Sequence, residues 1–240
     1  MRIAICFSGQ PRSFKKAYPY YKKNLFDKHP GKVDVFFHTW REDTKDLIMS
    51  DLIHTYKPKR HLFTSYLEDS DKFNQRFINT PNPARHPPSA TVNAFYSIFM
   101  SNLLRVQEEQ TFGGYDWVVR TRFDYALNAE IPFSKLEPNK IYVPNCRKTP
   151  NRDFCNDQFA FGSAHVMTAY SSTYLWLNQF YANDIQMIGE DMLAANLKMY
   201  NLVGENLMYV DMKNPFPPGP YNGTPHSLIR DDYEKWQTNS

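Results

Sequence analysis

The chain has few cysteines and no long apolar segment, and both absences narrow its class. Its 240 residues include only three cysteines, too few and too scattered for a disulfide scaffold. Cys6 lies in an apolar segment and is predicted to be a buried thiol, whereas Cys146 and Cys155 could pair only in an oxidising compartment. No segment approaches the roughly 20 apolar residues that cross a bilayer, and the first residues read as a strand, not as a signal peptide. We therefore expect a cytoplasmic protein without a transmembrane segment.

The motifs of several common enzyme classes are also absent. There is no Gly-x-x-x-x-Gly-Lys-Ser/Thr loop and no Gly-x-Gly-x-x-Gly after the first strand, which argues against P-loop enzymes and dinucleotide enzymes. A Gly-x-Ser-x-Gly elbow and a His-Glu-x-x-His zinc motif are missing as well. The net charge is only +3, and no basic run is interleaved with aromatic residues, so we expect no nucleic-acid partner.

The residues that are present predict one α/β domain, with residues 1–127 and 128–240 as its two halves. The composition is 42% hydrophobic and 16% aromatic, which is typical of a folded globule. Strand patterns alternate with helical patterns, which favours a mostly parallel, Rossmann-like central sheet flanked by helices. The predicted strands cover residues 3–7, 33–40, 62–66, 115–127, 140–144, 158–162 and 207–210. The predicted helices cover 14–28, 47–56, 91–112, 166–181 and 190–200. Residues 68–90 are expected to form a loop, either a flap beside a site or a surface excursion.

A row of charges on the predicted strand 115–127 is the strongest functional signal. Side chains alternate along a strand, so Arg120, Arg122 and Asp124 share one face, while aromatic and β-branched residues occupy the other. Such a row is costly unless its charges are paired. It is either a structural ion-pair network or a surface for an anionic ligand and its counter-cation, and we favour the ligand.

Two other predicted strands also carry polar residues at their carboxyl ends. Strand 3–7 is followed by Ser8-Gly-Gln-Pro-Arg12, and strand 33–40 ends in His38-Thr-Trp40. Ligands of open α/β sheets collect at the carboxyl ends of strands. Arginines suit phosphate oxygens, and a carboxylate suits a divalent ion. The predicted ligand-binding residues are therefore Ser8, Gly9, Gln10, Arg12, His38, Thr39, Arg120, Arg122 and Asp124.

Three acids in the second half are candidates for a general base. Asp157 lies at the mouth of a predicted strand, and Glu190 and Asp191 open a predicted helix after Gly189. A carboxylate there could accept a proton from a hydroxyl nucleophile. Acids also favour the first turn of a helix because they complement its dipole, so a purely structural role stays open for Glu190 and Asp191.

Together, five segments resemble small glycosyltransferases of the GT-A type. These segments are 3–12, 33–40, 115–124, 156–163 and 189–193. The resemblance is to glycosyltransferase domains of large DNA viruses, such as those that decorate chlorella-virus capsids, and to relatives in phages and bacterial polysaccharide clusters. It implies a sheet that binds a UDP- or GDP-sugar and passes the sugar to a hydroxyl of a glycan or glycoprotein acceptor. It also implies a nucleotide-sugar-binding first half, an acceptor and catalytic second half, and, for a viral protein, the host cytoplasm.

The resemblance further implies a metal and a catalytic base. Such enzymes use an Asp-x-Asp signature to hold a divalent ion, usually Mn²⁺ and sometimes Mg²⁺. The matching positions are Arg122-Phe-Asp124, so Asp124 is the expected metal ligand and Arg122 replaces the first acid. For an inverting reaction, Asp191 is the first choice of base, then Glu190, then Asp157. A non-catalytic nucleotide-sugar or carbohydrate-binding module on the same fold is the alternative.

Overall fold

The described chain forms one mixed sheet. The computed structural model describes residues 1–44, 46–68, 87–144 and 155–210. Within these ranges the strand order is β3-β2-β1-β4-β6-β5-β7. β1, β2, β3 and β4 are mutually parallel, β6 is antiparallel to β4 and β5, and β5 is parallel to β7. The strands are β1 Ile3–Ser8, β2 Val33–Trp40, β3 Arg60–Thr64, β4 Trp117–Arg122, β5 Ile141–Pro144, β6 Ala160–Gly162 and β7 Leu207–Val210. The predicted mostly parallel α/β sheet is confirmed.

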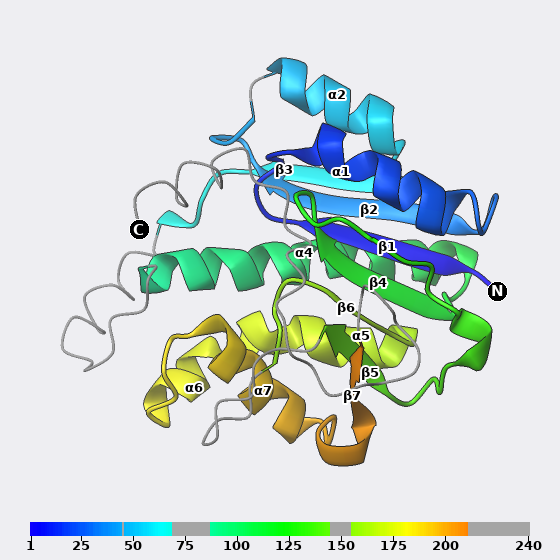
Figure 1. Cartoon of the computed structure of the whole chain (residues 1–240). Helices are drawn as coiled ribbons and strands as arrows, with labels where there is room; N and C mark the ends of the chain where they lie inside the picture. Colours follow the sequence, from blue (N-terminus) through cyan, green and yellow to red (C-terminus); the bar gives the residue numbers. More distant parts are fainter. Residues whose placement is uncertain (45, 69–86, 145–154, 211–240) are drawn as a thin grey trace, which may run out of the picture.

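Helices cover both faces of this sheet (Figure 1). One face carries α1 Phe14–Tyr21 with its π-helical continuation η1 Lys22–Phe26, α2 Asp46–Tyr56 and the short η3 Phe133–Lys135. The other face carries α4 Pro88–Phe112, α5 Ala164–Ser171, α6 Leu177–Ala182 and α7 Gly189–Met199. The 3-10 turns η4 Ser172–Trp176 and η5 Gly204–Asn206 complete the helical elements of the described residues. In these residues, no helix has both the length and the apolar character needed to span a bilayer.

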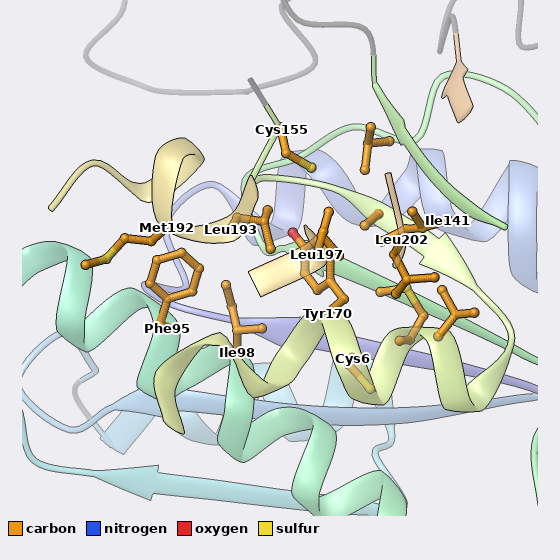
Figure 2. Packing of buried hydrophobic residues seen from close by; sticks show 14 of the residues in the cluster. Cys6, Phe95, Ile98, Ile141, Cys155, Tyr170, Met192, Leu193, Leu197 and Leu202 are labelled. Carbon is orange, nitrogen blue, oxygen red and sulfur yellow. The ribbon is translucent and has the colours of Figure 1, made fainter. Parts of the chain in front are cut away.

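Alternation along β1 divides the core into two layers. Ile3, Ile5 and Phe7 pack with α1 and α2, whereas Ala4 and Cys6 pack with α4, α5 and α7. Every residue of β1 is buried because helices cover both faces, which explains why a central parallel strand reads as a continuous apolar run. Figure 2 shows the second layer, where Cys6 lies near side chains of α4, α5 and α7. Burial raises the pKa of the Cys6 thiol to about 12, so the predicted buried thiol is confirmed.

The helix 91–112 is predicted from an apolar stripe with i, i+3, i+4 and i+7 spacing, and the buried face of α4 differs from that stripe. Val92 and Phe95 of the stripe are buried. Its other members are half-buried, namely Tyr96, Phe99, Leu103 and Val106. The fully buried positions include Ser97, Ser101 and Arg105. The two serines are small, which lets the helix approach β1 and β2 closely. Arg105 is tolerated there because it donates hydrogen bonds to Asn102 and Thr168. The apolar spacing thus predicted the helix but only part of its packing face.

Three element boundaries also differ from the sequence prediction. The predicted strand 115–127 ends at Arg122, where a turn begins, and the strand predicted at 62–66 lies at Arg60–Thr64. The helix predicted at 166–181 is interrupted by η4, where Ser172 Oγ and Thr173 Oγ1 donate to carbonyls three residues earlier. Such bonds compete with regular helix geometry. Most of the predicted loop 68–90, the residue Cys146 and the chain after residue 210 lie outside the described residues. The last three residues predicted as loop belong instead to α4, which begins at Pro88 and carries proline in its first turn, where a missing N–H costs no hydrogen bond.

Candidate functional site

The carboxyl ends of β1, β2 and β4 lie at one edge of the sheet. The chain runs from β1 outward to β2 and β3 and then returns to β4 on the other side of β1. Ligands of open α/β sheets bind where the strand order reverses in this way. Ser8 at the end of β1 is in register with His38 of β2 and with Arg122 of β4. Three polar strand ends therefore meet at the reversal.

Because β6 is antiparallel, it brings residues of the second half to the same edge. Arg120 is in register with Ala160, so the residues before β6 run beside those after β4. Asp157 precedes β6, and its main-chain carbonyl accepts a hydrogen bond from Nη1 of Arg120. Arg120 from the first half of the chain and Asp157 from the second half are thus linked by a hydrogen bond.

Arg120 is a buried cation without a carboxylate partner. Its side chain is 4% exposed, and Nη2 donates to Ser8 Oγ over 3.2 Å. Its Nε–H has no hydrogen-bond partner, and no acid of the described residues lies within ion-pair distance of it. Burial lowers the pKa of Arg120, yet an arginine remains charged at neutral pH. A buried guanidinium without a paired carboxylate is costly, and a bound anion would reduce that cost.

Arg122 and Asp124 are paired with each other. Arg122 Nε and Nη2 each lie 2.8 Å from one oxygen of Asp124, and the guanidinium of Arg12 lies 3.9 Å from the same carboxylate. Burial, the largest single effect, opposes the charge of Arg122, but its hydrogen bonds to Asp124 and the negative charges of Asp124 and Asp157 together outweigh burial and raise its pKa. The interpretation as a structural ion pair therefore applies to Arg122 and Asp124. For Arg120, ligand binding stays a prediction.

The segment after β1 provides one exposed cation and several satisfied groups. Gly9 has φ 92°, which favours glycine, and its N–H donates to Ser97 Oγ over 2.8 Å. Gln10 donates to Asp43 and accepts from Arg12. The side chain of Arg12 is 43% exposed. Of this segment, Arg12 is therefore the side chain best placed for a ligand.

His38 and Thr39 are not brought into this group as ligand-binding residues. The ring nitrogens of His38 bond Ser97 Oγ and Thr64 Oγ1, both over 2.9 Å, and burial lowers its pKa to about 4. His38 is thus a neutral residue that joins β2, β3 and α4. Thr39 is fully buried and, by strand alternation, points to the opposite face of the sheet.

Glu190 lies at the start of α7, beside Asp157. A Cβ added at Gly189 would be 2.8 Å from Asp157 Oδ2, so the Asp157 carboxylate packs directly on the helix start. Burial first, and then the charges of Asp157 and Asp191, raise the pKa of Glu190 to about 7. A helix dipole acting alone would lower it. A carboxyl group that titrates near neutral pH is suited to general acid–base chemistry.

Replacing Glu190 by glutamine should stabilise the protein at alkaline pH. The pKa of Glu190 is raised from 4.5 to about 7 by folding, so stability falls as the pH rises through that window. After discounting for its partial exposure, we expect Glu190→Gln to gain about 1–2 kcal/mol at pH 8 and little at pH 4.5. Urea unfolding at both pH values measures this. Glu137→Gln, at a side chain that is 68% exposed, is the matched control. An equal gain at both pH values would contradict the assignment.

The described residues do not fit a divalent metal at Asp124. Both of its oxygens are engaged by Arg122, and a second guanidinium lies nearby. No cluster of three or more His, Cys, Asp or Glu side chains with metal-binding geometry occurs in the described ranges.

Sequence reasoning missed Ser97, which organises the ends of β1 and β2. Its hydroxyl accepts from the Gly9 N–H and bonds both the ring and the main-chain carbonyl of His38. The available signal was a serine within an otherwise apolar helical segment. Tyr66 was also missed, and it donates to Asp43 and stacks on Trp40.

Comparison with known proteins gives one family. A family model described as a domain of unknown function (DUF7796) matches residues 1–217, a range that contains every site residue described above. No curated protein matches the chain.

Proposed function

We propose that this chain, which belongs to the DUF7796 family, binds a nucleoside-diphosphate sugar and transfers the sugar to a hydroxyl of a glycan or glycoprotein acceptor. UDP- and GDP-sugars are the donors to test first. The diphosphate would bind at the end of β1, against Arg120, Ser8 and Arg12. The GT-A resemblance of the sequence supports the reaction class, and the arginines support the type of ligand.

The single observation that carries the proposal is the position of Arg120. It is buried and lacks a carboxylate partner among the described residues, and it lies at the strand-order reversal where α/β sheets bind ligands. An arginine offers planar, paired donors that match phosphate oxygens. A phosphate-bearing ligand would both neutralise this residue and use its fixed orientation.

The proposed transfer uses arginines to stabilise the leaving diphosphate and a carboxylate to take the proton of the acceptor hydroxyl. In the transfer step, the acceptor oxygen bonds the anomeric carbon while the bond from that carbon to the diphosphate oxygen breaks. Negative charge then grows on the departing diphosphate, where Arg120 and Arg12 would stabilise it. Glu190 would take the proton from the acceptor hydroxyl, since its pKa of about 7 suits proton transfer at neutral pH. On this proposal Glu190 comes before Asp191 as the candidate base, and the transfer would invert the anomeric carbon.

A binding module without catalysis is the second candidate. The observation that favours it is the closed pair of Arg122 and Asp124, which occupies the positions of the Asp-x-Asp signature. On this alternative the site would hold a nucleotide sugar, and no rate would depend on Glu190.

Donor binding and turnover together test the proposal. We expect UDP or GDP, and one of their sugars, to raise the melting temperature as mass action requires. Release of nucleoside diphosphate should be measurable and should fall at least about 100-fold in Glu190→Gln. Binding without release would establish the binding module, and no stabilisation by any nucleotide sugar would refute the proposed ligand.

Metal dependence separates the two ways of holding the diphosphate. Because arginines occupy the place of the metal, we expect the nucleotide-induced shift to survive EDTA. Loss of the shift with EDTA and its return with Mn²⁺ or Mg²⁺ would instead support a metal at Asp124.

A further inference from the structure

Gln10, in the segment after β1, is held by two side chains that follow β2 and β3. Its Nε2 group donates to Asp43 Oδ1 over 3.0 Å and to the Tyr66 hydroxyl over 3.2 Å. The Tyr66 hydroxyl in turn donates to Oδ2 of the same carboxylate. These three half-buried residues form a closed set of hydrogen bonds, the Gln10 triad.

The Gln10 triad fixes which end of the Gln10 amide faces Arg12. An ionised carboxylate only accepts hydrogen bonds, so the NH2 group of the amide must face Asp43. The amide oxygen then points the other way, where it accepts a hydrogen bond from Nη2 of Arg12. A flipped amide would set two acceptors together at Asp43 and two donors together at Arg12. Asp43 therefore determines, through Gln10, which group Arg12 meets.

The other two members of the triad are themselves fixed by the sheet. The turn that carries Asp43 is tied to β3, because the N–H of Arg41 donates to the Thr64 carbonyl over 2.9 Å. The ring of Tyr66 stacks on that of the buried Trp40, with the ring centroids 4.8 Å apart and an angle of 25° between the planes. The triad thus rests on two strands of the sheet.

Arg12 benefits from this support because its side chain is exposed. An exposed arginine samples many rotamers, and holding one of them in a complex costs conformational entropy. Nη2 bonds Gln10, and Nε lies 3.9 Å from Asp124 Oδ2. These two contacts leave the N–H groups of Nη1 for a phosphate oxygen. Because Gln10 is neutral, it orients the guanidinium without cancelling its charge.

We propose that Gln10 is a positioning residue that orients Arg12 toward the diphosphate of the donor. The inference rests on the proposed function and adds a residue that supports the site without touching the ligand. The sequence predicts direct contact between Gln10 and the ligand, whereas on this inference Gln10 acts through Arg12. Orienting the cation in advance lowers the entropy that binding must overcome, so the benefit exists only while Arg12 is present.

A double-mutant cycle of Gln10 and Arg12 tests the inference. Binding of pyrophosphate and of UDP to the full chain is measured by calorimetry at pH 7. We expect Gln10→Leu to weaken both about fivefold and Arg12→Met to weaken both about 20-fold. The double variant should lose no more than Arg12→Met alone, because Gln10 then has nothing to orient. A structural role would add the same loss in both backgrounds, and that result, or unchanged affinity in Gln10→Leu, overturns the inference.

Tyr66→Phe is a second, milder variant. It keeps the ring that stacks on Trp40 and removes only the hydroxyl shared by Gln10 and Asp43. We expect affinity for both probes to fall about twofold to threefold, and the loss should disappear in the Arg12→Met background. A loss of the same size in that background would contradict positioning.

Tyr115→Phe is the matched control, at the amino ends of β2 and β4. The hydroxyl of Tyr115 also donates to an aspartate, Asp34, over 2.7 Å, but at the opposite end of the strands from the site. Its affinity for both probes should not change, and a loss equal to that of Tyr66→Phe would overturn the inference. Failure of pyrophosphate and UDP to bind the unmodified protein would refute the proposed function itself. Binding that Arg12→Met leaves unchanged would refute only the positioning of Arg12.

Discussion

Replacing Arg120 by methionine is expected to weaken binding of UDP or GDP about 100-fold without lowering the free energy of unfolding. Two charge-assisted hydrogen bonds to phosphate account for that loss. Stability should hold or rise, because methionine fills the same buried space without an uncompensated charge. Calorimetry with the nucleotides and urea unfolding at pH 7 measure the two effects.

Arg105→Met is the matched control, at a second buried arginine. Arg105 is fully buried, bonds Asn102 and Thr168, and has Nη1 2.6 Å from Glu109 Oε2, an ion pair that lacks hydrogen-bond geometry. Its replacement should cost about 3 kcal/mol of stability and leave the nucleotide affinity of the folded protein unchanged. If Arg120→Met were as destabilising as Arg105→Met and bound nucleotide normally, Arg120 would be a structural residue.

The second large effect is an asymmetry within the pair of Arg122 and Asp124. The carboxylate of Asp124 is 1% exposed, whereas the side chain of Arg122 is 25% exposed. Arg122→Met removes the two hydrogen bonds that Arg122 donates to a buried acid, and we expect it to cost about 3 kcal/mol. Asp124→Asn leaves an amide facing a cation that water can reach, and we expect it to cost about 1 kcal/mol. Urea unfolding at pH 7 compares them.

The double variant Arg122→Met with Asp124→Asn completes the cycle. It should be more stable than the sum of the two single losses predicts, because the charge and its partner are removed together. Equal costs for the two single variants would mean that solvent reaches Asp124 as easily as Arg122, and the structural ion pair would then be a surface feature.

The first strand was predictable because it is a nearly continuous apolar run. Strands buried on both faces leave little choice of side chain, as the six buried residues of β1 illustrate. Ser8, Arg120 and Arg122 were predicted near the carboxyl ends of strands, and these ends meet at one edge when the strands are parallel. The register in which Ser8 faces Arg122 agrees with that reasoning.

The remaining features depend on contacts that local sequence patterns do not encode. β6 is three residues long, and its antiparallel insertion beside β4, which brings Asp157 to Arg120, has no periodic signal of its own. His38 has a structural role because its ring bonds the hydroxyl of Ser97, which lies 59 residues further along the chain. The raised pKa of Glu190 requires burial and Asp157, which no helix pattern predicts.

The insertion of β6 between β4 and β5 also has a consequence for biosynthesis. β5 is made before β6, yet it is β6, and not β5, that pairs with β4. On the ribosome, a nascent chain that has reached residue 144 therefore holds β4 with an unpaired edge, and such edges invite aggregation. This edge of β4 can pair only after residue 162 has left the exit tunnel, so a chaperone would protect the chain most between the emergence of β4 and that of β6.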